Sequence, residues 1–347
     1  MKIFKKYFWT FLITVLLIFI MVCSRLPIVA EWYMQNCYPK IAAVLSFFSR
    51  IIPFSFFDLL IIAAIIALLG GIAMVCMKRL SLLRFGKLFI LTALWIAVWF
   101  YMAWGIAYFR PDFYERFGIE PPVEDKEFFE QLVLLYIDSL NRTYVAEPYF
   151  FDSNEVKTEI ETLYSKHHEI LQLRYPTGWR RNKKTMLAPV MTKMGIAGFF
   201  APFFNEIKVN RFSLPITYPY TLAHEMAHQF GIASEAEANL YATVICTSSS
   251  HPLVRYSGYL QTVSYLLGTL RKTSPTNYRE IMQKIDPRVL ADFRAIREHW
   301  HKAINPTLSA AQDRVYDAYL RTNRQESGIL SYSEVTGLIV AWAEKEL

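Results

Sequence analysis

The sequence predicts a mainly α-helical membrane protein, in which three N-terminal transmembrane helices precede an α+β domain with a small sheet. Hydrophobic types make up 54% of the 347 residues and charged types only 19%, whereas ordinary soluble domains carry about 25% charged residues. The long apolar runs all lie before residue 110, and polar and apolar residues are mixed after it. The same figures exclude a disordered chain, a coiled coil and a disulfide-rich scaffold.

Three apolar runs are long enough to cross a hydrocarbon core of about 30 Å, which needs roughly 20 helical residues. They cover residues 7–24, 54–77 and 88–109. The first run lacks the small residues of a signal-peptide cleavage site, because Met21-Val22-Cys23 is bulky, and we therefore expect an uncleaved span. Residues 1–110 are predicted to form a membrane domain.

The positive charge of the chain predicts its orientation. The net charge is +7, but residues 1–110 carry +9 and the remaining residues −2. Basic residues in short loops mark the cytoplasmic side of a membrane, and they precede the first span or lie between the second and third: Lys2, Lys5, Lys6, Lys78, Arg79, Arg84 and Lys87. We expect a cytoplasmic N-terminus, an outer C-terminal domain and the lipid bilayer as a partner. No basic face is left to predict nucleic-acid binding.

Two features near the spans have more than one interpretation. The segment Ile41–Ile52 is apolar with one arginine, which is typical of a helix lying along the membrane surface. Asp58, near the start of the second span, is either a solvated helix-end acid, which we favour, or part of a polar pathway. The cysteines form no CxxC motif, and only a Cys37–Cys246 disulfide stays open.

Residues 111–347 are predicted to form the outer domain. Met194–Phe200 and Glu206–Asn210 are the best strand candidates, and the basic segment Arg174–Lys193 is predicted to be a loop. Apolar residues spaced three and four apart predict helices in the rest. The expected helices are Phe128–Leu140, Asn154–Leu173, Tyr259–Leu270, Val289–Ile304, Ala310–Arg321 and Ser333–Glu346.

The strongest chemical signal is His224-Glu225-Met226-Ala227-His228. Two histidines four residues apart project from the same side of a helix, so both imidazoles can reach one Zn²⁺ ion. Chance gives about 0.01 such motifs in a chain of this composition. The flanks suit a helix, because Thr217 can cap its start, Pro219 is tolerated in its first turn and Gly231 can end it.

A catalytic zinc site uses three protein ligands and leaves a fourth position open. Ser234 occupies the place of the third histidine in the HExxHxxGxxH pattern, so the third ligand is expected to be Glu235 or Glu237. Ser234-x-x-Glu237 also fits a capping box, which gives Glu237 a structural role. We therefore favour Glu235 and keep Glu237 as the alternative.

The segment Glu235-x-x-Ala238-Asn239 resembles the ExxAD segment of membrane-bound, glutamate-ligated zinc peptidases of the CAAX-prenyl-protease and HtpX type. The resemblance implies that Glu235 is the third zinc ligand. It also implies that Asn239 hydrogen-bonds a zinc histidine, as outer partners of metal ligands do. The chain departs from the pattern in having Asn239 instead of aspartate, and in its much shorter spacer after His228.

Several segments spread over nearly the whole chain occur together. They are Pro53-Phe54-Ser55, Gly198-Phe199-Phe200-x-Pro202-Phe203 with Glu206 and Asn210, the segment 224–239, Tyr256-Ser257-Gly258-Tyr259, and Tyr319-Leu320 with Gly328 and Ser331-Tyr332. This combination resembles an uncharacterised bacterial membrane family, catalogued as domain of unknown function 3810. The resemblance implies a three-span protein of the bacterial cytoplasmic membrane with a zincin-like outer domain, and it implies no substrate.

The motif predicts zinc-dependent hydrolysis. Zinc lowers the pKa of a bound water to about 7 and polarises a carbonyl, and Glu225 is placed to act as general base and then as general acid. An oxyanion stabiliser is expected nearby, and among His251, Arg255 and Tyr256 we favour Tyr256. Glu206–Asn210 is either an edge strand that pairs with an extended peptide or plain sheet structure.

Two classes of function stay open. The leading hypothesis is a membrane-anchored zinc metallopeptidase that cleaves a peptide or envelope protein on the outer face of the membrane. The alternative is a non-catalytic envelope sensor or scaffold, in which zinc only joins two helices. An intramembrane protease is not predicted, because residues 213–246 contain no run of 18 apolar residues.

Overall fold

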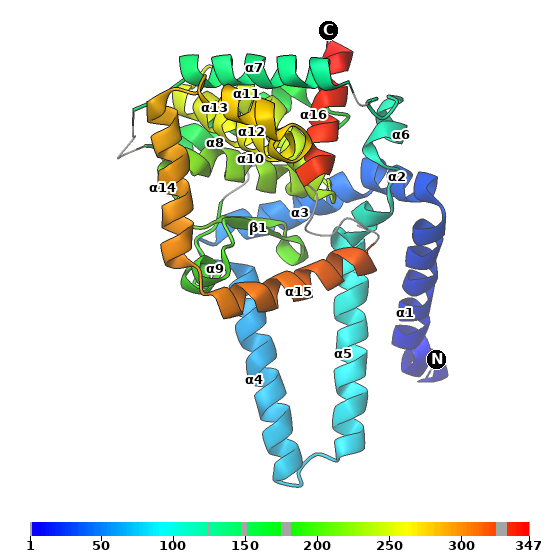
Figure 1. Cartoon of the computed structure of the whole chain (residues 1–347). Helices are drawn as coiled ribbons and strands as arrows, with labels where there is room; N and C mark the ends of the chain where they lie inside the picture. Colours follow the sequence, from blue (N-terminus) through cyan, green and yellow to red (C-terminus); the bar gives the residue numbers. More distant parts are fainter. Residues whose placement is uncertain (1, 124, 147–150, 175–181, 324–331, 347) are drawn as a thin grey trace. The chain divides into compact units, whose positions relative to one another are not determined.

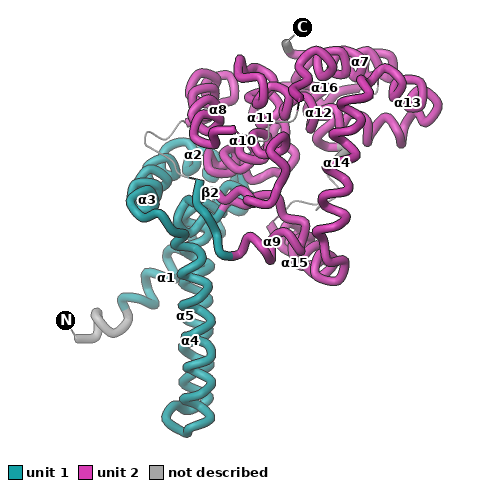
Figure 2. Tube along the Cα trace, turned by 90° about the vertical axis from the view of Figure 1, so that its left-hand side faces the viewer, with its two compact units in different colours: residues 1–111, 176–186, 201–206 teal, residues 112–175, 187–200, 207–347 magenta. Residues whose placement is uncertain are grey.

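The computed structural model describes residues 2–123, 125–146, 151–174, 182–323 and 332–346. The chain divides into two compact units, coloured separately in Figure 2. Unit 1 comprises residues 1–111, 176–186 and 201–206, and unit 2 comprises residues 112–175, 187–200 and 207–347. The predicted fold class is confirmed in its outline, because the described residues are mostly helical and include one two-stranded sheet.

Unit 1 consists mainly of helices. They are α1 (Lys2–Arg25), α2 (Pro27–Asn36), α3 (Tyr38–Ile51), α4 (Phe56–Cys76), α5 (Leu82–Ala103) and the 3₁₀ helix η1 (Gly105–Phe109). Three stretches are long and apolar enough to cross a membrane, namely Phe8–Arg25, Phe56–Cys76 and Leu82–Ala103. Few of their side chains are buried, and a short connection joins α4 to α5 (Figure 1). The three predicted apolar helices are therefore present.

The third apolar helix lies six residues earlier than predicted. Its start is set by Ser81, whose side chain accepts a hydrogen bond from the backbone N–H of Arg84, as an N-cap residue does. Arg84 and Lys87 therefore belong to the first turns of α5, and not to the preceding loop. The helix ends at Ala103, because Trp104 leaves helical geometry and η1 follows with all its residues buried.

A buried carboxylate caps the start of α4. Both oxygens of Glu206 accept backbone N–H groups, one from Phe56 at 2.9 Å and one from Phe57 at 3.2 Å. The hydroxyls of Ser49 and Ser55 also donate to this carboxylate. A helix start leaves N–H groups without partners and attracts negative charge, so Glu206 satisfies α4 where its apolar run begins.

Asp58 is a buried helix-end acid in the first turn of α4. Its carboxylate accepts hydrogen bonds from the Thr185 hydroxyl at 3.0 Å and the Met186 N–H at 2.7 Å. The favoured interpretation of Asp58 as a helix-end acid therefore holds, although protein donors rather than solvent satisfy it. All four cysteines are free, so Cys37 and Cys246 form no disulfide.

Unit 2 contains most of the predicted outer helices. Its helices are α6 (Phe113–Phe117), α7 (Lys126–Arg142), α8 (Ser153–His167), α9 (Ala188–Met194), the 3₁₀ helix η3 (Pro215–Thr217), α10 (Tyr218–Gln229), α11 (Glu235–Thr247), α12 (Pro252–Thr273), α13 (Pro275–Met282), α14 (Pro287–Ala303), α15 (Pro306–Thr322) and α16 (Tyr332–Glu346). The loop predicted over Arg174–Lys193 is wrong where α9 forms. Residues 175–181 lie outside the described residues.

Two short strands form the sheet. They are β1 (Gly198–Ala201) and β2 (Glu206–Val209), joined through the 3₁₀ helix η2 (Pro202–Phe204). The strand predicted from Met194 starts later, because α9 ends there and Gly195 follows in the left-handed region at φ +78°, which glycine adopts without a steric penalty. All four residues of β2 are buried, whereas the first three of β1 are half-buried.

The hydrophobic core of unit 2 includes many buried side chains of α10, α11 and α12. Helices α10 and α11 pack against each other and against α12, while α7 and α16 pack on α12. Leu222, Ala223, Met226 and Ala227 of α10 are each at most 1% exposed, so this apolar face of the helix is held in the core. This packing also fixes the direction in which the face of α10 that carries His224 and His228 points.

Candidate metal centre

Helix α10 begins without the predicted side-chain cap. Thr217 already has helical dihedral angles because η3 runs directly into α10, and its hydroxyl instead donates to the carbonyl of Leu214. Pro219 lies in the first turn, as predicted. At the other end the helix stops at Gln229, and Gly231 takes a left-handed φ of +91°, which is the conformation expected after a helix C-terminus.

A short turn then reverses the chain and starts α11. The side chain of Ser234 accepts a hydrogen bond from the N–H of Glu237 and caps the new helix. Glu235 consequently lies in the first turn of α11, and α11 packs along α10. The turn thus places the carboxylate of Glu235 beside α10, the helix that carries the two histidines.

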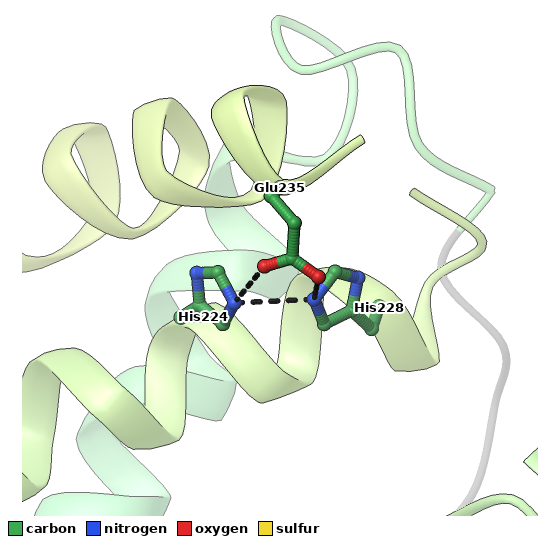
Figure 3. A group of neighbouring side chains, drawn as sticks. All are labelled: His224, His228 and Glu235. Atoms are coloured by element: carbon green, nitrogen blue, oxygen red, sulfur yellow. Dashed lines mark hydrogen bonds and ion pairs between the residues drawn. The ribbon is translucent and has the colours of Figure 1, made fainter. Parts of the chain in front are cut away.

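His224, His228 and Glu235 converge on one point (Figure 3). The two Nε2 atoms are 3.1 Å apart, and the Glu235 oxygens lie 3.2 Å from Nε2 of His224 and 3.5 Å from Nε2 of His228. Ligand atoms about 2.0–2.1 Å from a tetrahedral zinc ion are separated by about 3.3 Å. The three side chains therefore fit a zinc ion, and they form the only such group found among the described residues.

The other nitrogen of each imidazole is held by an oxygen. Nδ1 of His224 lies 2.8 Å from the side-chain oxygen of Asn239, which also accepts a hydrogen bond from the Tyr265 hydroxyl. Nδ1 of His228 lies 2.7 Å from the carbonyl of Ile232. An Nδ1–H donor bonded in this way fixes the ring orientation and directs Nε2 to the ligand position. Asn239 thus contacts one of the two histidines, as the resemblance implied, and that histidine is His224.

Without a metal the three groups attract one another strongly. Burial acts to lower the pKa of His228, but the charge and hydrogen bond of Glu235, together with the charge of Glu225 and the carbonyl of Ile232, outweigh burial and raise this pKa to about 9. Burial also acts to raise the pKa of Glu235, yet the two histidines hold it well below its usual range. The metal-free site therefore contains an ion pair between protonated His228 and Glu235. A metal ion must displace the proton of His228 before it binds this imidazole.

Glu225 lies beside these ligands in a confined position. It is 5% exposed, and burial raises its pKa to about 7 against the attraction of the two histidines. Gly198 of β1 leaves room for it, because a Cβ atom added there would lie 2.8 Å from Oε1 of Glu225. A carboxyl with a pKa near neutrality is suited to exchange protons.

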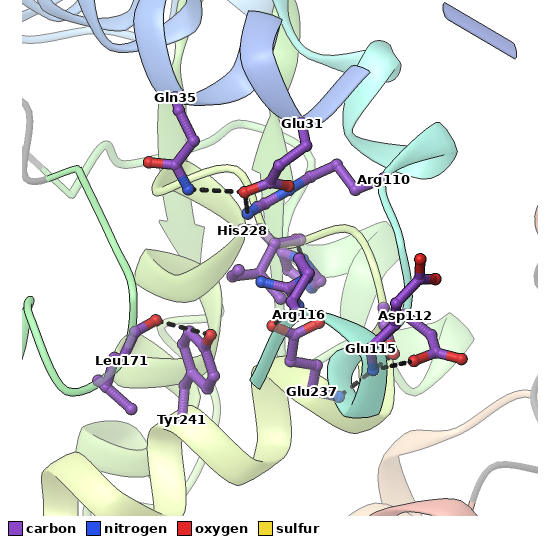
Figure 4. A network of polar contacts seen from close by, with 12 residues as sticks. Glu31, Gln35, Arg110, Asp112, Glu115, Arg116, Leu171, His228, Glu237 and Tyr241 are labelled. Carbon is purple, nitrogen blue, oxygen red and sulfur yellow. Dashed lines mark hydrogen bonds and ion pairs between the residues drawn. The ribbon is translucent and has the colours of Figure 1, made fainter. Parts of the chain in front are cut away.

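Glu237, the alternative third ligand, is engaged elsewhere. Its carboxylate forms an ion pair with Arg116 of α6, and both side chains are almost fully buried (Figure 4). Its backbone N–H donates to Ser234 in the predicted capping interaction. The structure therefore groups Glu235, and not Glu237, with the histidines.

The proposed oxyanion residues are not brought to the histidines. Tyr256 donates its hydroxyl hydrogen bond to Asp292 of α14 and is fully buried; burial raises the pKa of this hydroxyl. His251 faces Glu155, and Nε of Arg255 donates to the carbonyl of Ser249. These contacts give Tyr256 a packing role in the core, so we do not retain it as a stabiliser of the reaction.

Sequence reasoning missed a different tyrosine. Tyr316 of α15 donates a hydrogen bond to Oε1 of Glu235, 81 positions earlier in the chain. Helix α15 packs on α9, and the N–H of Asn305, just before it, donates to the carbonyl of Lys193. No spacing in the sequence indicates this contact, because it depends on how distant helices pack.

Comparison with known proteins assigns a family. The family described as "Protein of unknown function (DUF3810)" matches residues 33–340. The chain belongs to the DUF3810 family. The match includes the whole candidate centre and the α4 and α5 helices, so these features lie within the DUF3810 region. No curated protein and no solved structure matches the chain.

Proposed function

We propose that this DUF3810 protein is a membrane-anchored zinc metallopeptidase that hydrolyses peptide bonds on the outer face of the bacterial cytoplasmic membrane. The observation that carries the proposal is the tripod of His224, His228 and Glu235, with ligand atoms 3.1–3.5 Å apart. A hydrolytic zinc site typically has three protein ligands and a glutamate directly after the first histidine, which here is Glu225 after His224. Such a site keeps its fourth position for water or substrate.

The chain's own residues have separate tasks in this reaction. His224, His228 and Glu235 would hold the ion, which supplies a Lewis acid that polarises water and a substrate carbonyl. Glu225 takes a proton from the attacking water and returns it to the leaving amine. Asn239 and the Ile232 carbonyl keep the imidazoles oriented. The buried Lys208 is close enough to Glu225 to lower its pKa and so favours the proton-accepting form.

The strand suited to bind an extended peptide is β1, and not the segment Glu206–Asn210 suggested by the sequence. Strand β2 is buried along its length, whereas β1 is half-buried and has β2 on one edge only among the described strands. Gly198 of β1 lies against Glu225. A peptide that pairs with the outer edge of β1 through backbone hydrogen bonds would therefore lie beside the general base.

Zinc content and hydrolysis test the proposal together. The full chain, purified in mild detergent, should contain about one zinc ion by elemental analysis, and His224→Ala and Glu235→Gln should lose it. Glu225→Gln should keep the ion and lose hydrolysis of a quenched-fluorescence peptide library by about 10²-fold or more. His251→Ala, outside the tripod, serves as the control.

Each failure has a defined meaning. A wild-type chain that binds no zinc would overturn the proposed metal centre. Zinc binding without hydrolysis, with Glu225→Gln identical to wild type, would instead favour the non-catalytic envelope sensor or scaffold, in which the ion joins α10 to α11.

A further inference from the structure

We infer that Tyr316 is a positioning residue for the metal centre: its hydroxyl holds Glu235 so that one carboxylate oxygen is presented to the ion. The inference rests on the metal-binding part of the proposed function. It extends the centre from the α10–α11 pair to a third helix, α15, which contributes no ligand atom among the described residues.

The two oxygens of Glu235 have different surroundings. Oε2 lies 3.2 Å from Nε2 of His224, whereas Oε1 lies 3.5 Å from Nε2 of His228 and accepts the hydrogen bond of Tyr316. A carboxylate oxygen that already accepts a hydrogen bond from a hydroxyl is a weaker partner for a metal. The geometry therefore points to Oε2 as the ligand atom and to Oε1 as the oxygen that Tyr316 holds.

Glu235 has few partners besides the two histidines that fix its side chain. It lies in the first turn of α11 with 26% of its side chain exposed. Within the part of the chain that the structure describes, the partners of its carboxylate are the two histidines and Tyr316. The two histidines each have an Nδ1 partner, supplied by Asn239 and Ile232. Tyr316 gives the third ligand the equivalent outer contact, and loss of such contacts typically weakens metal binding 10–100-fold.

Removal of one hydroxyl tests the inference without reference to any substrate. The full-length Tyr316→Phe variant in detergent is expected to bind zinc 10–100-fold more weakly than wild type, measured by competition with a chromophoric chelator. Tyr319→Phe is the matched control, because Tyr319 lies on the same helix and stacks on Tyr316 at 6.0 Å between ring centroids. It should bind zinc like the wild type.

A second variant separates donation from packing. Tyr316→Gln keeps an N–H donor and should recover part of the zinc affinity lost in Tyr316→Phe. Circular dichroism of the metal-free variants should match wild type, and loss of the fold would overturn the inference, since the hydroxyl would then stabilise the chain rather than the ligand.

The remaining outcomes are equally decisive. If wild type binds zinc and Tyr316→Phe binds it as tightly, Tyr316 does not position Glu235 and the inference fails while the metal centre stands. Unchanged zinc affinity with a lower kcat would likewise overturn it and assign the hydroxyl to the substrate. If wild type binds no zinc, the proposed function itself fails.

Discussion

Gly198 shows how closely single atoms are fitted around Glu225, the proposed general base. A Cβ atom at this position would lie 2.8 Å from Oε1 of Glu225 and 2.8 Å from Cγ2 of Thr221. Real Cβ atoms essentially never approach other heavy atoms so closely, so even a methyl group has to displace the carboxylate. Because Gly198 has no side chain, β1 can lie close to α10 at this point.

We expect Gly198→Ala to lower hydrolysis of the peptide library by at least about 10-fold, because small misplacements of a catalytic group are costly. Zinc content should stay near that of wild type, since the ligands are not displaced. Gly268→Ala is the control, because nothing lies within 4 Å of the added Cβ in α12. Equal activity of the two variants would contradict the assigned position of Glu225.

The ion pair in the metal-free centre predicts a pH dependence of stability. The folded-state pKa of His228, about 9, lies above the value of about 6.5 in an unfolded chain. The attraction to Glu235 therefore contributes fully to the stability of the folded state below about pH 6.5. This contribution is lost as the pH rises through 9. The pKa of Glu225 is raised to about 7, so the ionisation of Glu225 lowers the stability of the folded state as the pH rises from about 4.5 to 7. The change in stability between pH 7 and 9 therefore reports mainly on His228.

Thermal unfolding followed by circular dichroism, with chelator present, measures this effect. Between pH 7 and 9 the free energy of unfolding should fall by roughly 2–3 kcal/mol, from a shift of about 1.4 kcal/mol per pKa unit. In Glu235→Gln this attraction is absent, so the free energy of unfolding should change less with pH over the same interval. A wild-type curve as flat as that of the variant would disprove the ion pair.

Residue-scale chemistry was predictable from the sequence where it is local. His224 and His228 lie four residues apart, so their spacing alone predicts that they share a face, and Glu225 follows His224 directly. Asn239 was indicated by a resemblance. Tyr316 could not be predicted, because its contact with Glu235 spans 81 positions and depends on the packing of α15.

At the scale of elements, a buried ion pair ties α6 to α11. Arg116 and Glu237 are almost fully buried, and the pair fixes the start of α11 next to the candidate ligand Glu235. Truncation of one partner leaves an uncompensated buried charge, which typically costs 3–5 kcal/mol. The same acid that could have served as a ligand is thus used to anchor the helix.

Glu237→Ala should therefore lower the free energy of unfolding of the metal-free chain by about 3–5 kcal/mol, measured by thermal unfolding in detergent. The paired change Arg116→Met with Glu237→Leu should restore most of the loss. Glu280→Ala, at an exposed position of α13, is the matched control. Complete loss of zinc from a Glu237→Ala chain that remains folded would identify Glu237 as a ligand and refute this role.

Element types were predictable from apolar spacing, whereas several ends were not. The apolar run of the third span indicates residues 88–109, but Ser81 starts the helix earlier and carries Arg84 and Lys87 into it. Basic side chains can lie along such a helix with their charges directed to the interface, so charge alone does not mark its end. Helix α9 was missed because it is short and lies in a basic segment.

At the scale of the whole molecule, the apolar helices and the candidate centre belong to different units. Among the described residues, unit 1 contains the three stretches that are long and apolar enough to span a membrane, and unit 2 contains all three candidate ligands. The basic residues at the N-terminus and around the α4–α5 connection favour one orientation, with the N-terminus inside and unit 2 outside. This orientation is part of our proposal.

Reporter fusions test it directly in a bacterial host. Green fluorescent protein fluoresces when fused after Arg79 only if that connection is cytoplasmic, and alkaline phosphatase is active after Leu347 only if the C-terminus is outside. We expect both signals, and the exchanged pair of fusions should be silent. The opposite pattern would place the candidate centre in the cytoplasm and remove an envelope substrate from consideration.

The tight turn between α10 and α11 has a consequence for how the centre is assembled. All three proposed ligands lie within twelve consecutive residues, 224–235, and the entropy lost on closing so short a loop is small. The hairpin can gather its ligands while the chain is still being synthesised, long before α15 leaves the ribosome. Capture of the ion would then come early, and the hydroxyl from α15 would secure an ion already in place.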